Sequence, residues 1–111
     1  MDTRLNYPGI VKTILKEYTN LFAHGGVPSM HTLFDDQQQS YMLIDIGWEG
    51  KKYTHDVIIH IDIIGSKIWI QRDNTEEGVA IDLLEAGVPK EDIVLGFHHP
   101  KVRPYTEFAV G

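Results

Sequence analysis

Two runs of alternating apolar and polar residues flank a Gly-Ser turn, and they constrain the fold more than any other feature of this sequence. The first run, residues 57–63, has a β-branched aliphatic side chain at every odd position, and the second, residues 67–72, repeats the alternation. A period of two is typical of strands with one buried face. Because the connection at Gly65-Ser66 is short, the two runs predict a β-hairpin.

A helix-start signal follows the second run directly. Asp73 stands three residues before Glu76, so its carboxylate can accept from free helix N–H groups while Glu76 reaches back, as in a capping box. Gly87 can take the left-handed conformation that ends a helix, and Val88 can then fold back on Leu83. We therefore expect a helix of about three turns between these signals. Its expected buried stripe consists of Val79, Ala80, Leu83 and Leu84.

The other segments predict one more helix and more strands. Apolar residues recur at helical spacing over residues 5–22, before the Gly25-Gly26 pair and Pro28. Strands are expected at 30–34, 40–48 and from 52 onward, and a short apolar run covers 93–97. The predicted fold class is α+β. It has an N-terminal helix, an antiparallel meander of about four strands, a second helix and a short C-terminal strand or tail, with the helices on one face of the sheet.

Length and charge bound the classes of function. The chain of 111 residues predicts a single domain, 1–111, and it has no cysteine for redox chemistry or a Cys-based zinc site. No apolar run approaches the roughly 20 residues that span a bilayer, so a cytoplasmic protein with no membrane partner is expected. Sixteen acidic residues against ten basic ones give a net charge of −6, which disfavours direct binding to nucleic acid.

Two patterns hint at metal chemistry. His60 and Asp62 share one strand face and His98-His99 lie in a later loop, but a zinc site needs three or four converging ligands, and no spacing in the sequence forces convergence. Glu49-Gly50-Lys51 resembles the acidic and lysine pattern of metal-dependent nucleases, although it falls at a predicted hairpin tip rather than on a rigid strand. We expect no catalytic residues, metal or cofactor, with a metal-assisted hydrolase or nuclease as the alternative.

Several side chains are candidates for a protein-interaction surface. Trp, Tyr and Arg anchor interfaces more often than their abundance suggests. The candidates lie on the outer sheet face, at the hairpin tip and in the C-terminal run, and they are Trp48, Lys51, His60, Asp62, Trp69, Arg72, His98, Arg103, Tyr105 and Phe108. The two tryptophans fit equally well as core or cross-strand partners. Arg72 is expected to pair with Asp73, Glu76 or Glu77.

The sequence from residue 59 to residue 110 closely resembles the XisI-like family, the fdxN element excision controlling factors found in cyanobacteria. The strongest pieces are HIDI at 60–63, KIWIQRD at 67–73, TEEG at 75–78, the segment 87–97 and YTEFAV at 105–110. The resemblance continues upstream through ILKEY at 14–18 and YMLIDIGWEGK at 41–51, so it covers nearly the whole chain. Asn74, where glycine is more frequent in the family, departs from the pattern in a turn.

This resemblance implies a small α+β accessory factor without known catalytic activity. It implies that the protein is required, together with a companion XisH-like protein, for a site-specific recombinase to excise a DNA element during heterocyst development. We also expect the chain to form a homo-oligomer, a dimer, through its sheet or tail. A direct DNA-binding regulator is the remaining alternative, for which affinity should fall steeply with salt.

Overall fold

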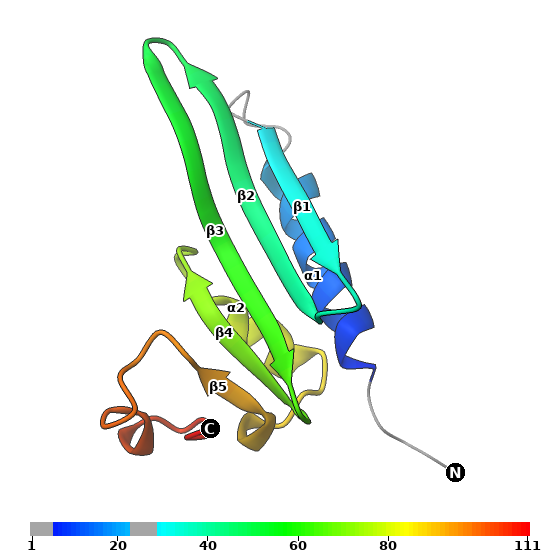
Figure 1. Cartoon of the computed structure of the whole chain (residues 1–111), viewed down its shortest axis with the longest axis vertical. Coiled ribbons are helices and arrows are strands. Elements are labelled where there is room, and N and C mark those ends of the chain that lie inside the picture. The colour runs from blue at the N-terminus through cyan, green and yellow to red at the C-terminus, as the bar shows by residue number, and fades with distance from the viewer. Residues whose placement is uncertain (1–5, 23–28) are drawn as a thin grey trace.

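The computed structural model of the chain describes residues 6–22 and 29–111. Five strands form one sheet in sequence order, and α1 (Tyr7–Phe22) and α2 (Val79–Glu85) lie on the same face of it (Figure 1). Strands β1 (Ser29–Asp35), β2 (Ser40–Glu49), β3 (Lys52–Ile64) and β4 (Lys67–Asp73) pair antiparallel, and β5 (Ile93–Leu95) lies parallel to β4. The predicted α+β meander is confirmed, and residues 93–95 of the short apolar run add β5 to it as a parallel strand.

The alternation in β3 and β4 reports which face of the sheet is buried. Ile59, Ile61 and Ile63 pack against the helices, while His60 and Asp62 lie on the opposite, outer face. The same division separates Ile68 and Ile70 from Trp69 and Gln71 on β4. The rest of the core is Tyr41 and Leu43 of β2, Val11, Ile14 and Leu15 of α1, Val79 and Leu83 of α2, Val88, and Ile93 of β5.

The predicted start of the second helix is wrong. Helix α2 begins at Val79 and not beside Asp73, because residues 74–78 form a loop that ends at Gly78 with φ of 92°. Asp73 still caps the helix from a distance: its Oδ2 accepts from the Val79 N–H at 2.7 Å and its Oδ1 from the Thr75 N–H at 2.9 Å. Within the described chain Glu76 makes no return hydrogen bond. The carboxylate therefore organises a loop and then a helix of two turns.

The predicted end of this helix is confirmed. Gly87 has φ of 98°, its N–H donates to the Leu84 carbonyl, and the Val88 N–H donates to the Leu83 carbonyl at 3.0 Å. These two bonds are those of a Schellman motif, in which the following apolar residue folds back on the helix. Both Val88 and Leu83 are buried, so the chain turns back toward the sheet at this point and enters β5.

Helix α1 largely follows its predicted stripe. Val11, Ile14 and Leu15 are buried, but Leu21, which the spacing places in the stripe, is 69% exposed because it lies in the last turn of the helix, beyond the core. The expected break at 24–28 and the side chains of Leu5 and Phe22 lie outside the described residues. None of the helices in the described ranges has both the length and the apolar character needed to cross a membrane.

Three hydrogen bonds to carboxylates fasten α1 to the rest of the molecule. The Tyr7 hydroxyl donates to Asp92, and the Tyr18 hydroxyl donates to Asp82 of α2. Between them, Lys12 Nζ lies 2.9 Å from Asp36, in the β1–β2 turn. That carboxylate also accepts from the hydroxyl of buried Tyr41 at 2.8 Å. These contacts fix the position of α1 along the sheet as well as its burial.

The C-terminal segment docks on the sheet, as expected from its apolar composition. Ala109 forms a parallel bridge with Val94, and its N–H donates to the Ile93 carbonyl at 2.9 Å. Phe108 packs against the core. The tail therefore covers the free edge of β5, an edge that would otherwise expose unpaired backbone groups.

The middle strands are longer than their neighbours. Strands β2 and β3 have 10 and 13 residues, whereas β1 and β4 have seven each. Pairing with β1 reaches only Ile46 of β2, and pairing with β4 begins only at Ile59 of β3. Residues 47–56, called the arm below, therefore project beyond the rest of the sheet (Figure 1). The radius of gyration, 14.8 Å, exceeds the roughly 13 Å of a compact chain of this length.

The tyrosine contacts predict a loss of stability in alkali. Burial, together with the hydrogen bonds to Asp92 and Asp36, raises the pKa of Tyr7 and of Tyr41 to about 12. A folded-state pKa above the unfolded value of 10.0 gives stability that is present below pH 10 and lost as pH rises toward 12. Denaturant titrations across this range should show the decline, and Tyr7→Phe/Tyr41→Phe should flatten it while costing about 2 kcal/mol at neutral pH. Tyr105→Phe is the control, and an unchanged slope in the double variant would contradict this account.

Candidate interaction surfaces

A polar network occupies the outer face of the sheet where β2, β3 and β4 meet. Asp62 lies at its centre: Oδ1 accepts from Ser40 Oγ at 2.6 Å and contacts His60 Nε2 at 3.0 Å, and Oδ2 accepts from Gln71 Nε2 at 3.2 Å. All four side chains are half-buried. The predicted pairing of His60 and Asp62 on one face is therefore correct, and two neighbouring strands supply further partners.

The geometry of this network suits structure rather than hydrolysis. In a nucleophilic triad the histidine uses one ring nitrogen for the hydroxyl and the other for the carboxylate. Here His60 Nε2 faces both Ser40 Oγ, at 3.2 Å, and Asp62 Oδ1. Across residues 6–22 and 29–111, no three His, Asp or Glu side chains gather as metal ligands would. The network instead satisfies the polar side chains of a half-covered sheet face.

Arg103 holds the C-terminal segment against this outer face. Its guanidinium carbon lies 5.1 Å from the centre of the Trp69 ring, a cation–π contact. The same side chain donates to three backbone carbonyls, those of His98 at 3.1 Å, Gly96 at 3.3 Å and Val110 at 3.4 Å. Because five donors in a planar fork can serve several acceptors at once, arginine suits this position better than lysine does.

Trp69 of β4 and most of the predicted candidates in the C-terminal run therefore make contacts within the chain. Trp69 is half-buried under Arg103, Phe108 packs on the core, and His98 stacks on Phe97 with ring centres 4.6 Å apart. Tyr105 is different, since it is 89% exposed. The contacts that the structure shows for Trp69, His98 and Phe108 are intramolecular, and a role of these residues in binding a partner stays a prediction.

The arm carries the exposed aromatic surface. Trp48 is 69% exposed and Tyr53 50% exposed, and their rings lie 5.1 Å apart as a cross-strand pair. Gly50, with φ of 60°, and Lys51 form the two-residue turn at the tip. Tyr53 was missed as a candidate, although an aromatic residue on each side of a tight turn is the signal that could have found it. Large aromatic side chains on an unsupported hairpin are unusual in a protein that acts alone.

Arg72 lies at the base of the arm and does not make its predicted ion pair. Its Nε donates to the Val57 carbonyl at 2.9 Å, beside the Asn74 N–H, which donates to the Ile58 carbonyl at 2.8 Å. Among the described residues no carboxylate pairs with Arg72. Its guanidinium instead satisfies the edge of β3 where β4 ends, because a free strand carbonyl is closer than the carboxylates of the following loop.

Two carboxylates face each other where the arm leaves the sheet. Asp45 of β2 is the cross-strand partner of Asp56 of β3, and its Oδ1 is buried without a hydrogen bond. Burial, and then the charges of Asp56 and Glu49, raise the pKa of the Asp45 carboxyl. Like charges directly opposite one another weaken strand pairing, so Asp45 and Asp56 destabilise the pairing of β2 and β3 at the base of the arm.

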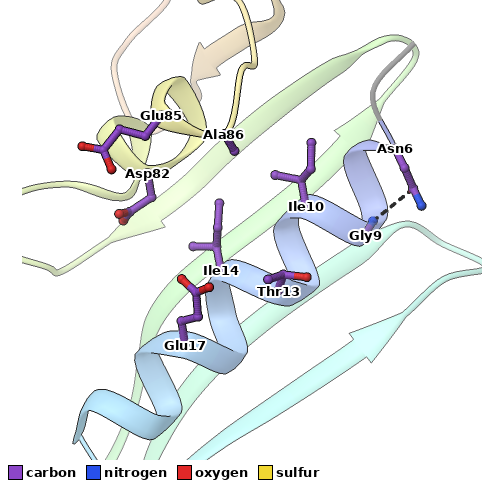
Figure 2. A pocket seen from close by; sticks show the side chains of 9 residues that line it. All are labelled: Asn6, Gly9, Ile10, Thr13, Ile14, Glu17, Asp82, Glu85 and Ala86. Carbon is purple, nitrogen blue, oxygen red and sulfur yellow. Dashed lines mark hydrogen bonds between the residues drawn. The ribbon is translucent and has the colours of Figure 1, made fainter. Parts of the chain in front are cut away.

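A groove that no sequence pattern indicates runs between α1 and α2. The part beside the N-terminal half of α1 is a cavity of about 510 Å³. Ile10 and Ile14 of α1 form its floor, and Glu17, Asp82 and Glu85 lie at its border (Figure 2). A second cavity, of about 800 Å³, shares Glu17 and Asp82 and continues to the loop before α2. That loop adds Glu76 and Glu77, and no Lys or Arg among the described residues lines either part. Only the packing of two distant helices brings these acids together.

Comparison with known proteins matched one family and six solved chains. The XisI protein family model matches residues 1–110. A crystal structure of a XisI-like protein from Anabaena variabilis is 33% identical to this chain, with a TM-score of 0.87. The fdxN element excision controlling factor XisI from the same organism is 36% identical, with a TM-score of 0.81. Each match covers 95% of this chain and 96% of the solved chain. A comparison with curated proteins gave no match.

The contacts of Arg103 predict what its removal would do. Arg103→Ala should free the C-terminal segment, cost about 1–3 kcal/mol in stability and shift the fluorescence of Trp69 to longer wavelength, because water then reaches the ring. The measurement is made in a Trp48→Phe background so that only Trp69 emits. Arg103→Lys should give an intermediate result, and Lys101→Ala, in the same loop, should change nothing. Unchanged emission from Trp69 in Arg103→Ala would show that the segment is held by other contacts.

Proposed function

The chain belongs to the XisI family, and we propose that it is a non-catalytic accessory factor that controls excision of a DNA element by binding a partner protein. The structurally similar Anabaena protein that is named an fdxN element excision controlling factor supports a role in excision control. We propose further that the partner is an XisH-like companion, that the setting is heterocyst development in the cytoplasm, and that the recombination chemistry belongs to a separate recombinase.

The observation that carries this proposal is the exposed Trp48–Tyr53 pair on the projecting arm. Much of the other predicted surface makes contacts within the chain: the outer face carries its polar network and the C-terminal segment that Arg103 holds, and Tyr105 is the candidate of that segment that stays exposed. The arm offers two large aromatic side chains whose backbone is already ordered by strand pairing. Trp and Tyr are the side chains most often found at the energetic centre of protein interfaces.

Charge supports a protein partner over DNA. The net charge of −6 repels a polyanion, and the exposed lysines of the arm, Lys51 and Lys52, share it with Glu49 and Asp56. A phosphate-tracking surface needs several bases without interspersed acids. The arm therefore suits an apolar recess on a protein, with Lys51 at its rim.

Copurification with an XisH-like protein tests the proposal. A complex of defined mass should form, and Trp48→Ala/Tyr53→Ala should weaken it at least tenfold, since truncating one central aromatic residue of an interface commonly costs more than 1 kcal/mol. Tyr105→Ala removes a still more exposed aromatic side chain elsewhere and should leave the affinity unchanged.

Two results would contradict the proposal. If no complex forms at micromolar concentrations of both proteins, the accessory role through this companion is wrong. If the complex forms and the arm variant binds as tightly as the unmodified chain, the companion uses a different surface. Circular dichroism and thermal unfolding of the arm variant show whether the fold is intact before either result is interpreted.

A further inference from the structure

The groove between α1 and α2 has the properties of a binding site. Ile10 and Ile14 give it an apolar floor, and they point toward α2 across the gap (Figure 2). The charged residues that line it are all acidic, Glu17 from one helix and Asp82 and Glu85 from the other. Within the described chain no Lys or Arg pairs with these three acids. An apolar recess with an uncompensated negative border suits an apolar group that is flanked by positive charge.

The arm of the same chain has the complementary properties. Its tip combines the exposed Trp48–Tyr53 pair with two lysines, Lys51 in the turn and Lys52 beside it, against one acid, Glu49, which lies across the hairpin from Lys52. Neither lysine has an ion-pair partner in the residues that the structure describes. The arm lies beyond the end of the shared sheet and the groove lies between the helices on one face, so the two surfaces belong to different parts of one molecule.

We propose that the tip of the arm of one copy of this chain occupies the acidic groove between α1 and α2 of a second copy. The aromatic pair covers Ile10 and Ile14, and Lys51 and Lys52 reach Glu17 and Glu85. Two copies that exchange arms about a two-fold axis make this contact twice and form a closed dimer. The proposal uses the same arm as the companion contact above, so the companion and the second copy compete for it.

The size of the contact indicates a weak dimer. A tryptophan or tyrosine buries at most about 150–250 Å², so the four aromatic side chains of two arms bury no more than roughly 600–1,000 Å². A standard stable interface buries about 1,600 Å². The aromatic side chains therefore supply at most about half of such an interface before the lysine stems and the rest of the groove are added. A dimer that dissociates at micromolar concentration leaves the arm accessible to a companion that binds more tightly.

Charge reversal tests the pairing with the purified chain alone, so the result does not depend on the companion. Sedimentation equilibrium should give twice the chain mass of 12.7 kDa at high protein concentration and moderate salt, with dissociation as salt rises. Lys51→Glu/Lys52→Glu places negative charge against the acidic groove, and Glu17→Lys/Glu85→Lys places positive charge against the basic tip. Each double variant alone should have a dimer dissociation constant at least tenfold higher.

Mixing the two variants is the decisive step. In the mixture an acidic tip meets a basic groove, and a basic tip meets an acidic groove, so both contacts of the dimer are restored. A one-to-one dimer should form in the mixture and in neither variant alone. The control Lys16→Glu/Lys101→Glu reverses two exposed charges outside both surfaces and should dimerise like the unmodified chain.

Three results would overturn the inference. An unmodified chain that stays monomeric at several hundred micromolar excludes the exchange, and copurification with the companion then tests the proposed function separately. Dimers that persist in both charge variants place the interface elsewhere. Failure of the mixture to dimerise, when the unmodified chain does, would show that the tip and the groove do not meet each other.

Discussion

The unequal length of the strands is the constraint on which the rest of the structure depends. Two helices can cover only the part of the sheet where all the strands are present, and β1 and β4 end after seven residues each. Strands β2 and β3 continue, and within the described ranges 6–22 and 29–111 no further strand pairs with residues 47–56 of this hairpin. A hairpin without such support does not bury its side chains, and this is why Trp48 and Tyr53 remain exposed while Tyr41, on the same strand as Trp48, is fully buried.

The two faces of the sheet are covered in different ways. Helices cover one face with aliphatic side chains. On the other face the C-terminal segment is held by Arg103 over Trp69, and a separate polar network surrounds Asp62. Polar side chains in that position find partners within the chain and are not left for a ligand. The arm keeps an exposed aromatic pair with two lysines and one glutamate at its tip, and the groove keeps acidic side chains that no Lys or Arg of the described residues pairs with.

Patterns that act over a few residues were readable from the sequence, whereas features that depend on distant packing were not. The alternation of β3 and β4, the Gly65-Ser66 turn and the glycine end of α2 follow from local rules, and all three are confirmed. The start of α2 was misplaced because Asp73 reaches across six residues to Val79, while a capping box reaches across three. Arg72 was misassigned because its partner is a carbonyl of a neighbouring strand. Nothing local could indicate that Glu17 and Glu85 border one groove, since two helices bring them together.

The proposed function depends on the arm, and not the C-terminal run, being the surface that binds a partner. Backbone hydrogen exchange tests this point most directly when it compares the free chain at high dilution with the chain in the presence of the proposed XisH-like companion. Slower exchange confined to residues 47–56, with residues 93–110 unchanged, is the predicted result. Slower exchange across residues 98–108 with an unaffected arm would contradict this prediction, and would place the interaction surface on the segment that Arg103 holds.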